Sequence, residues 1–150
     1  MKQVESLTVM MNGCEVGQLR LDPSGKRCVF QYAKSWLKDG FAISPLKLTG
    51  YLTQDPRQVE QMFRRMVFNV LVQNKDDHAK NFSFIYRNGQ WQLAPAYDLT
   101  VCPQGCNGEH ATTVNHSGNP TDDDMLKAAE SIRISAKRAK EIIADIREKI

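Results

Sequence analysis

The segment NKDDHAKN, residues 74–81, concentrates polar side chains directly after an apolar stretch. Asp76 and Asn81 are five residues apart, and another aspartate, Asp98, follows in the sequence AYDLT. In protein kinases, an aspartate in this pattern accepts the proton of the attacking hydroxyl, and the asparagine and the second aspartate offer oxygen atoms to Mg²⁺. The spacing therefore indicates phosphoryl transfer. It leaves open a simpler interpretation, a capped helix end followed by a polar loop.

The elements around this segment can be predicted from caps and periodicity. Asp55 and Pro56 suit the N-cap and the first position of a helix, and Gln58 completes the spacing of a capping box. Apolar residues then recur with the helical period over Val59–Leu71. Downstream, Asn88-Gly89 between two apolar runs predicts a β-hairpin with a tight turn. We expect this rigid hairpin to fix the separation of the polar segment and the second aspartate.

The chain is predicted to begin with a small sheet. Residues 6–32 alternate in the manner of strands and form three short apolar runs. Asn12-Gly13 and the Asp-Pro-Ser-Gly stretch at 22–25 separate these runs and favour turns. Residues 33–40 can form one helical turn that ends at a glycine. A β-rich start therefore precedes the core helix.

Two further regions complete the predicted order of elements. Residues 41–52 are expected to be extended or irregular, because Pro45 and Gly50 resist a helix. Residues 102–120 are rich in Gly, Asn and Pro and are expected to form a loop. Two terminal helices should follow, capped by Thr121 and Ser135.

Composition excludes few classes of protein but limits the size of the fold. The 150 residues are 41% hydrophobic and 25% charged, which suits one domain or two small pieces that share a core. A net charge of +3 is too small to indicate a nucleic-acid binder. The sequence contains no apolar run of membrane-spanning length, and its first residues do not resemble a signal peptide. Four cysteines without such a signal favour reduced thiols and a cytoplasmic location.

Longer stretches of the sequence resemble one family. FNVLVQNKDDHAKNFSFIY, WQLAPAYDLT and GEHATTVNHSG are similar to segments of the HipA family, which are bacterial serine/threonine kinases and usually the toxin half of a toxin–antitoxin pair. The resemblance covers about residues 51–150. An earlier stretch, TVMMNGCEVGQLRLDPSGKRCVFQYAKSWL, resembles the β-rich subdomain that opens these proteins. Together the two resemblances imply an α+β fold. The β-rich subdomain would span residues 1–48. Part of the C-terminal kinase lobe, mainly helical with a β-hairpin, would span residues 49–150.

The resemblance also implies a set of roles. Asp76 would be the catalytic base, and the residues that would surround the ATP phosphates and close the site are His78, Lys80, Asn81, Tyr97 and Asp98. Asn81 and Asp98 would hold Mg²⁺, and no role is assigned to Asp77. The implied partners are a helix-turn-helix antitoxin and a translation-related protein substrate, with DNA contacted only through the antitoxin.

The chain departs from the family pattern before Asp76. A kinase of this type needs a Gly-rich loop and a strand lysine upstream of the catalytic aspartate. Here the upstream glycines stand at 13, 17, 25, 40 and 50, and none forms a phosphate-binding cluster. We therefore expect little or no activity from this chain alone, and self-association through the exposed faces of the lobe. The alternative is an inactive regulatory protein that binds a HipA-type kinase or its antitoxin.

Two other interpretations remain open at this point. Cys102, Cys106, His110 and His116 are residue types that bind zinc, although their spacing is not that of a usual zinc knuckle. The terminal helices, residues 122–149, are basic and could contact DNA. Acidic residues are interspersed among the basic ones, which favours a solvated helix face instead.

Overall fold

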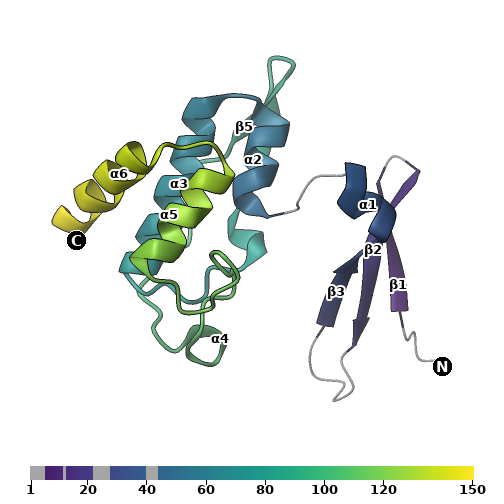
Figure 1. Ribbon diagram of the computed structural model, residues 1–150, viewed down its shortest axis with the longest axis horizontal. Coiled ribbons are helices and arrows are strands. Elements are labelled where there is room, and N and C mark those ends of the chain that lie inside the picture. Colours follow the sequence, from purple (N-terminus) through teal and green to yellow (C-terminus); the bar gives the residue numbers. More distant parts are fainter. Residues whose placement is uncertain (1–5, 12, 22–27, 40–43) are drawn as a thin grey trace. The chain divides into compact units, whose positions relative to one another are not determined.

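The chain contains two compact units, residues 1–42 and 43–150. The computed structural model describes residues 6–11, 13–21, 28–39 and 44–150. The fold is α+β, as predicted: a three-stranded antiparallel sheet precedes a mostly helical region with a β-hairpin (Figure 1). The predicted boundary between 48 and 49 stays a prediction from the family resemblance. Among the described helices, none has the length and apolar character needed to cross a membrane.

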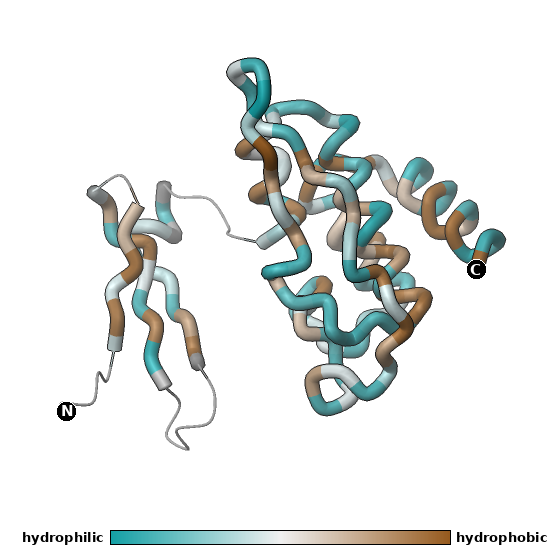
Figure 2. Tube along the Cα trace, turned by 180° about the vertical axis from the view of Figure 1, so that it is seen from behind, coloured by the Kyte–Doolittle hydropathy of each residue, from teal (hydrophilic) through white to brown (hydrophobic). Residues whose placement is uncertain are grey.

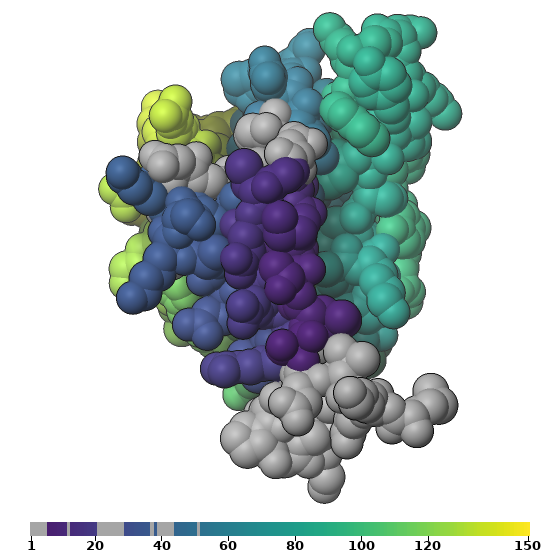
Figure 3. Space-filling view, turned by 90° about the vertical axis from the view of Figure 1, so that its right-hand side faces the viewer, coloured from purple at the N-terminus to yellow at the C-terminus, as the bar shows by residue number. Residues whose placement is uncertain are grey.

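The first unit is a β-meander with one short helix. Strands β1 (Ser6–Met11), β2 (Cys14–Leu21) and β3 (Cys28–Tyr32) pair in sequence order, and α1 (Lys34–Asp39) packs on β2. The three predicted strands and the helical turn are therefore confirmed. Five of the six residues of β1 are exposed, and the space-filling view shows this strand, in purple, at the surface (Figure 3). Asn12 and the predicted turn at 22–25 lie outside the described residues.

The second unit is built on packed helices. Its long helices are α2 (Pro45–Thr53), α3 (Pro56–Leu71), α5 (Asp122–Ser131) and α6 (Ala136–Glu148). Helix α3 packs against α2 and α6, and α5 packs against α6. The core contains Phe63, Val67, Met125 and Ile142, none of which exposes any surface. In α6 the hydrophobic residues recur between hydrophilic ones, which gives the helix one buried face (Figure 2).

Helix α2 overturns the prediction that 41–52 would be extended or irregular. Pro45 occupies the first turn, where its missing N–H would have had no helical partner, and Ser44 caps the helix by accepting a hydrogen bond from the Lys47 N–H. Gly50 lies in the helix interior, where a Cβ would meet the Val59 side chain of α3 at 3.5 Å. Glycine does have a weak helix propensity, but the packing of α2 on α3 offsets it.

The caps of α3 and the turn of the hairpin follow the sequence signals closely. Asp55 is the N-cap of α3 and accepts a hydrogen bond from Arg57 N at 2.9 Å. Strands β4 (Phe84–Arg87) and β5 (Gln90–Leu93) pair antiparallel through Asn88-Gly89, both with positive φ. The predicted capping box does not form, because the Gln58 side chain does not accept a hydrogen bond from the N-cap N–H. Gln58 Oε1 accepts from Leu93 N and so ties the hairpin to α3.

The terminal helices confirm their predicted caps. The Thr121 hydroxyl accepts a hydrogen bond from the Asp124 N–H, and the Asp124 carboxylate accepts one from the Thr121 N–H. These reciprocal bonds form a capping box. The hydrogen bond from Asn115 and those from Thr121 lower the Asp124 pKa to about 2. Ser135 caps α6 by accepting from Arg138 N.

The loop at 102–120 is held against the polar segment by buried hydrogen bonds. Asp77 Oδ2 lies 3.0 Å from His110 Nδ1, and these two side chains are 4% and 3% exposed. Asp77 Oδ1 accepts from Thr112 N at 3.0 Å, and the Thr112 hydroxyl donates to the Asp77 carbonyl at 2.6 Å. At Gly105, in the short helix α4 (Gly105–Gly108), a Cβ would lie 2.7 Å from Asp76 N. Close backbone contact and a buried polar cluster thus fix the segment's position.

Replacing Asp77 by alanine should destabilise the fold strongly. The substitution leaves His110 and the Thr112 N–H buried without their acceptor, and breaking a buried pair costs roughly 3–5 kcal/mol. Asp76→Ala is the matched control, because its carboxylate is exposed, and a surface change of this kind usually alters stability by less than about 0.5 kcal/mol. Urea unfolding of both variants measures the difference. Equal effects of the two substitutions would contradict a structural role for the buried cluster.

A second set of polar contacts joins the outer faces of α3 and α6. Glu60 accepts two hydrogen bonds from Arg138, at 2.7 and 2.9 Å, and one from Arg64 at 3.3 Å. Arg64 also reaches Asp145 at 3.0 Å. The two hydrogen bonds from Arg138, followed by the one from Arg64, lower the pKa of Glu60 below its usual value. The ionised carboxylate therefore stabilises the folded state.

Glu60→Gln should make stability less dependent on pH. Because the folded-state pKa is lowered, the contribution of Glu60 is fully present above the ordinary glutamate pKa and is lost as the pH falls through the folded value. At pH 7 we expect the variant to lose about 1 kcal/mol, and the two proteins to converge in acid. Denaturant titrations between pH 7 and pH 3 test this. Glu130→Gln, at an exposed position of α5, should follow the wild type throughout.

Candidate functional site

The side chain of Asn81 forms hydrogen bonds with two other predicted site residues, Asp76 and Asp98. It lies at the end of the 3-10 turn η1 (Ala79–Asn81), directly before the chain enters the hairpin. Its Nδ2 donates to Asp98 Oδ2 at 2.9 Å and to the backbone carbonyl of Asp76 at 3.2 Å. One amide therefore joins the three residues that the sequence singled out. The side chains of Asp76 and Asp98 remain exposed to solvent.

The backbone at Asp98 is held in an unusual conformation by the helix that precedes the site. Its φ of 56° is in the left-handed region, which a residue with a Cβ rarely adopts. The carbonyl of Asp98 accepts a hydrogen bond from Asn74 Nδ2 at 3.1 Å, and the same Nδ2 donates to Asn69 Oδ1 in α3 at 3.1 Å. Asn69 and Asn74 are buried. A strained residue that buried amides hold in place is typical of a functional site.

The remaining predicted residues lie on both sides of this centre. Tyr97, which is 43% exposed, donates from its hydroxyl to the backbone carbonyl of Lys80 and so links the two aspartate-bearing segments a second time. The Lys80 side chain is exposed. His78 is the residue before η1, and its buried Nδ1 has no hydrogen-bond partner in the part of the chain that the structure describes. One ring nitrogen thus points into the protein, away from solvent.

The chemistry of these side chains fits a magnesium site that substrate oxygens complete. Mg²⁺ prefers oxygen ligands and usually keeps several waters, with one or two carboxylates from the protein. Asp98 offers an exposed carboxylate within 2.9 Å of the Asn81 amide. The amide presents its NH₂ group to Asp98 here, so a half-turn of the amide would direct its oxygen to a cation. The described residues contain no group of three or more His, Cys, Asp and Glu that could hold a metal without such help.

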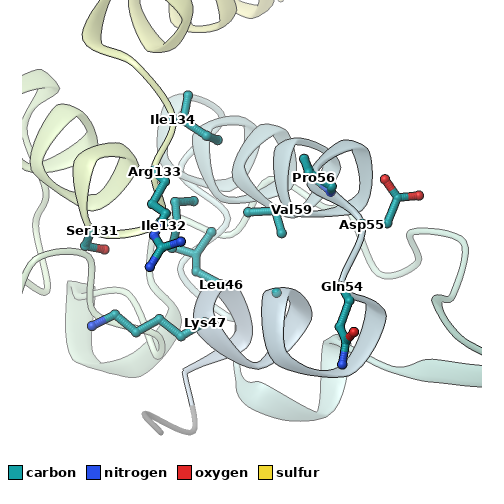
Figure 4. A pocket seen from close by; sticks show the side chains of 11 residues that line it. Leu46, Lys47, Gln54, Asp55, Pro56, Val59, Ser131, Ile132, Arg133 and Ile134 are labelled. Carbon is teal, nitrogen blue, oxygen red and sulfur yellow. The ribbon is translucent and has the colours of Figure 1, made fainter.

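A sizeable cavity of the second unit lies away from these residues. It measures about 500 Å³ and opens between α2, the start of α3 and the turn that joins α5 to α6 (Figure 4). Leu46, Val59 and Ile132 form its apolar wall, and Lys47 and Arg133 lie at its edge. None of its lining residues belongs to 74–81 or to 97–98. The candidate site therefore does not share this cavity.

Sequence reasoning missed two kinds of residue at this site. Asp77 was assigned no role, although its buried contacts with His110 and Thr112 fix the backbone beside Asp76. The available signal was the doublet of aspartates, since two ionised carboxylates close together repel each other and are more stable in different surroundings. Asn69 and Asn74 were also missed. A polar amide inside an otherwise apolar helical stripe was the sign that it has a buried partner.

The zinc interpretation is wrong. His110 directs Nδ1 to Asp77, and His116 occupies a tight turn with Asn115, where both residues have positive φ. The structure describes all four candidate ligands, and it does not gather three of them at one point. The DNA interpretation stays a prediction, and part of the basic charge on which it rests is balanced by acidic neighbours. The basic side chains of the terminal helices that form ion pairs are Lys127, Arg138, Arg147 and Lys149.

Comparison with known proteins gives a consistent result. The model of the HipA-like C-terminal domain matches residues 37–150. A protein of Haemophilus influenzae named "Putative kinase" is 48% identical over 48 residues, which are 31% of this chain and 14% of that protein. A second relative, "Putative kinase Y4dM" of Sinorhizobium fredii, is 40% identical over 60 residues, 39% of this chain and 15% of that protein. The matched segments thus make up a small part of both relatives.

A solved structure supports the fold. It is the HipA of a toxin–antitoxin system of Shewanella oneidensis MR-1, in complex with HipB and operator DNA. The match has a TM-score of 0.61 at 16% identity and covers 87% of this chain and 38% of that chain. The family model covers most of this chain and includes every candidate site residue. This protein belongs to the family of the HipA-like C-terminal domain.

Proposed function

We propose that this chain carries the phosphoryl-transfer part of a HipA-like serine/threonine protein kinase, the toxin component of a toxin–antitoxin system. The observation that carries the proposal is the contact of the Asn81 amide with the Asp98 carboxylate at 2.9 Å and with the Asp76 carbonyl at 3.2 Å. These are the residue types that kinases use for the base and for two magnesium ligands. Membership of the family supports the same reading.

Each site residue has a defined part in this proposal. Asp76 accepts the proton of the substrate hydroxyl, and its position is held through the neighbouring Asp77. Asn81 and Asp98 would hold the magnesium ion, and the exposed ammonium of Lys80 would offset phosphate charge. His78 would lie beside the phosphates, and Tyr97 would close the site by its bond to the Lys80 carbonyl. ATP and Mg²⁺, when bound, supply the transferred group and neutralise the charge that develops on it.

The partners of the chain are proposed from its relatives. The solved HipA structure contains HipB and operator DNA. We propose a helix-turn-helix antitoxin as the partner of this chain, with DNA contacted through that antitoxin, and a translation-related protein as substrate. A toxin with these partners acts in the cytoplasm. The ion-paired basic residues of α5 and α6 agree with indirect contact to DNA.

A second candidate is a catalytically inactive regulatory protein that binds a HipA-type kinase or its antitoxin. The observation that favours it is the sequence before Asp76, whose five glycines form no phosphate-binding cluster. Positioning of the phosphates supplies most of the rate enhancement in phosphoryl transfer, so a chain without a nucleotide clamp would be a very weak kinase. The two candidates differ in whether this chain binds nucleotide with magnesium.

Calorimetric titration with ATP and Mg²⁺ tests the kinase proposal. We expect binding that requires Mg²⁺ and that Asp98→Ala weakens about tenfold or more, because the variant loses a charged metal ligand. Asp76→Ala should leave binding nearly unchanged and remove any phosphoryl transfer that the wild type shows. Asp123→Ala, an exposed carboxylate on α5, is the control for a general loss of negative charge. Absence of binding in the wild type would reject the kinase proposal and support the regulatory protein.

Self-association is proposed from the exposed apolar side chains that follow the hairpin. Leu99 and Val101 are 44% and 74% exposed, and Trp91 on β5 is 42% exposed. Large exposed apolar patches often mark a contact with another chain, and we propose that these side chains belong to one. In sedimentation velocity at tens of micromolar, we expect a species larger than a monomer, and a shift towards the monomer in the double variant Leu99→Ser, Val101→Ser. Ile150→Ser is the control, and a monomeric wild type would contradict the proposal.

A further inference from the structure

A basic groove separate from the candidate site lies between α3 and the hairpin. Its volume is about 480 Å³. The polar side chains that line it are Gln61, Arg64, Arg65, Arg87 and Gln92. All of them carry N–H donors, and the lining contains no aspartate or glutamate. None of these residues takes part in the phosphoryl-transfer site described above.

Two hydrogen bonds between α3 and the end of the hairpin fix the walls of the groove. Gln58 of α3 accepts a hydrogen bond from Leu93 N, and Arg65 donates through Nη2 to the carbonyl of Ala94. Leu93 and Ala94 line the groove themselves. The distance between helix and hairpin is therefore set before any ligand arrives. A site that is already formed loses less conformational freedom on binding.

The charges in the groove are unequally compensated. Arg64 lies within 3.3 Å of Glu60 and 3.0 Å of Asp145, so its charge is balanced. Arg65 donates to a neutral carbonyl, and its buried Nη1 has no hydrogen-bond partner among the described residues. Burial lowers the pKa of Arg65, which reflects the cost of holding this cation out of water. Arg87 is exposed, and neither Arg65 nor Arg87 forms an ion pair within the part of the chain that the structure describes.

We propose that this groove is a binding site for a phosphate monoester group, with Arg65 and Arg87 as the charged ligands and Gln92 as a further donor. Guanidinium groups bind oxyanions in preference to other ligands, because their N–H groups match the spacing of the oxygen atoms. An anion in the groove would balance the charge of Arg65, whose hydrogen bond is to the neutral carbonyl of Ala94. A phosphate monoester carries close to two negative charges at neutral pH, which matches two uncompensated cations better than a carboxylate does.

Apolar side chains of the groove can contact the organic part of the ester. Ile85, Leu93 and Pro95 supply apolar surface along the groove. The volume exceeds that of one phosphate ion, so a phosphorylated side chain or a small phosphate ester can enter. Binding at this place does not require the kinase activity proposed above, because no residue belongs to both sets, although Arg65 lies close enough to Tyr97 for an electrostatic interaction.

The test is a titration followed by NMR of the arginine Nε–H and glutamine NH₂ signals, at constant ionic strength. The probes are inorganic phosphate, O-phosphoserine and acetate, each replacing sodium chloride. We expect saturable shifts with phosphate and phosphoserine, and little change with acetate. Tighter binding of phosphoserine than of phosphate would identify the monoester, and equal affinities would identify the free ion as the ligand and overturn the proposed ester specificity.

Variants separate this site from general charge effects. Arg87→Gln should weaken phosphoserine binding about tenfold and leave the fold intact, because Arg87 is an exposed residue at the end of β4. Arg65→Lys keeps the charge and should still weaken binding, since an ammonium group cannot donate two parallel hydrogen bonds to one oxyanion as a guanidinium does. The control is Arg57→Gln, at an 89% exposed side chain of the same helix α3. If Arg57→Gln and Arg87→Gln weaken binding equally, or chloride and phosphate give the same shifts, the groove is not a phosphate site.

Discussion

The candidate site depends on one buried side-chain amide, that of Asn74. Its Nδ2 donates to Asn69 within α3 and to the carbonyl of Asp98, and it exposes only 1% of its surface. A hydrogen bond in such surroundings is difficult to replace, since water cannot reach the groups that it would leave unpaired. The helix that supplies the core therefore also fixes the strained backbone of Asp98. Positions of reactive groups are more precise when a rigid element holds them.

The two neighbouring aspartates show how environment divides one residue type between two tasks. Asp77 is buried and accepts hydrogen bonds from the loop at 102–120, so its carboxylate stabilises the fold and is not accessible to a substrate. Asp76 is exposed and is available to a substrate. Because the two are adjacent, the buried carboxylate orients the exposed one through the backbone. The same loop contacts the backbone of Asp76 at Gly105, where a side chain would not fit.

Helix α3 connects these features through its different faces. Its apolar stripe, with Phe63 and Val67, is part of the core. The opposite side carries Glu60 and Arg64, which form ion pairs towards α6, and Arg65, which faces the hairpin. Polar residues on a helix are usually solvated and weakly constrained. Here several of them hold the hairpin and the last helix in place, and the Nη1 of Arg65 has no acceptor among the residues that the structure describes.

Much of this arrangement could be predicted from local signals in the sequence. The helical period over Val59–Leu71, the cap at Asp55 and the turn at Asn88-Gly89 are properties of short segments, and short segments determine where elements begin and end. The same signals, with the family resemblance, led to Asp76, Asn81 and Asp98 as neighbours. The local rule failed at α2, because the packing of Gly50 against Val59 lies outside the segment that contains the glycine.

The sequence by itself determined the order of elements, their caps and the residue types of the candidate site. The tertiary structure decided which of those residues are buried and which partners they meet. Asp77 and His110 are 33 positions apart, Asn74 and Asp98 are 24 apart, and Arg65 and Ala94 are 29 apart. Contacts over such separations form only when the core brings distant segments together, and no local pattern specifies them. The sequence therefore determines which chemical groups are present, whereas the fold determines which of them are buried and hence what each can do.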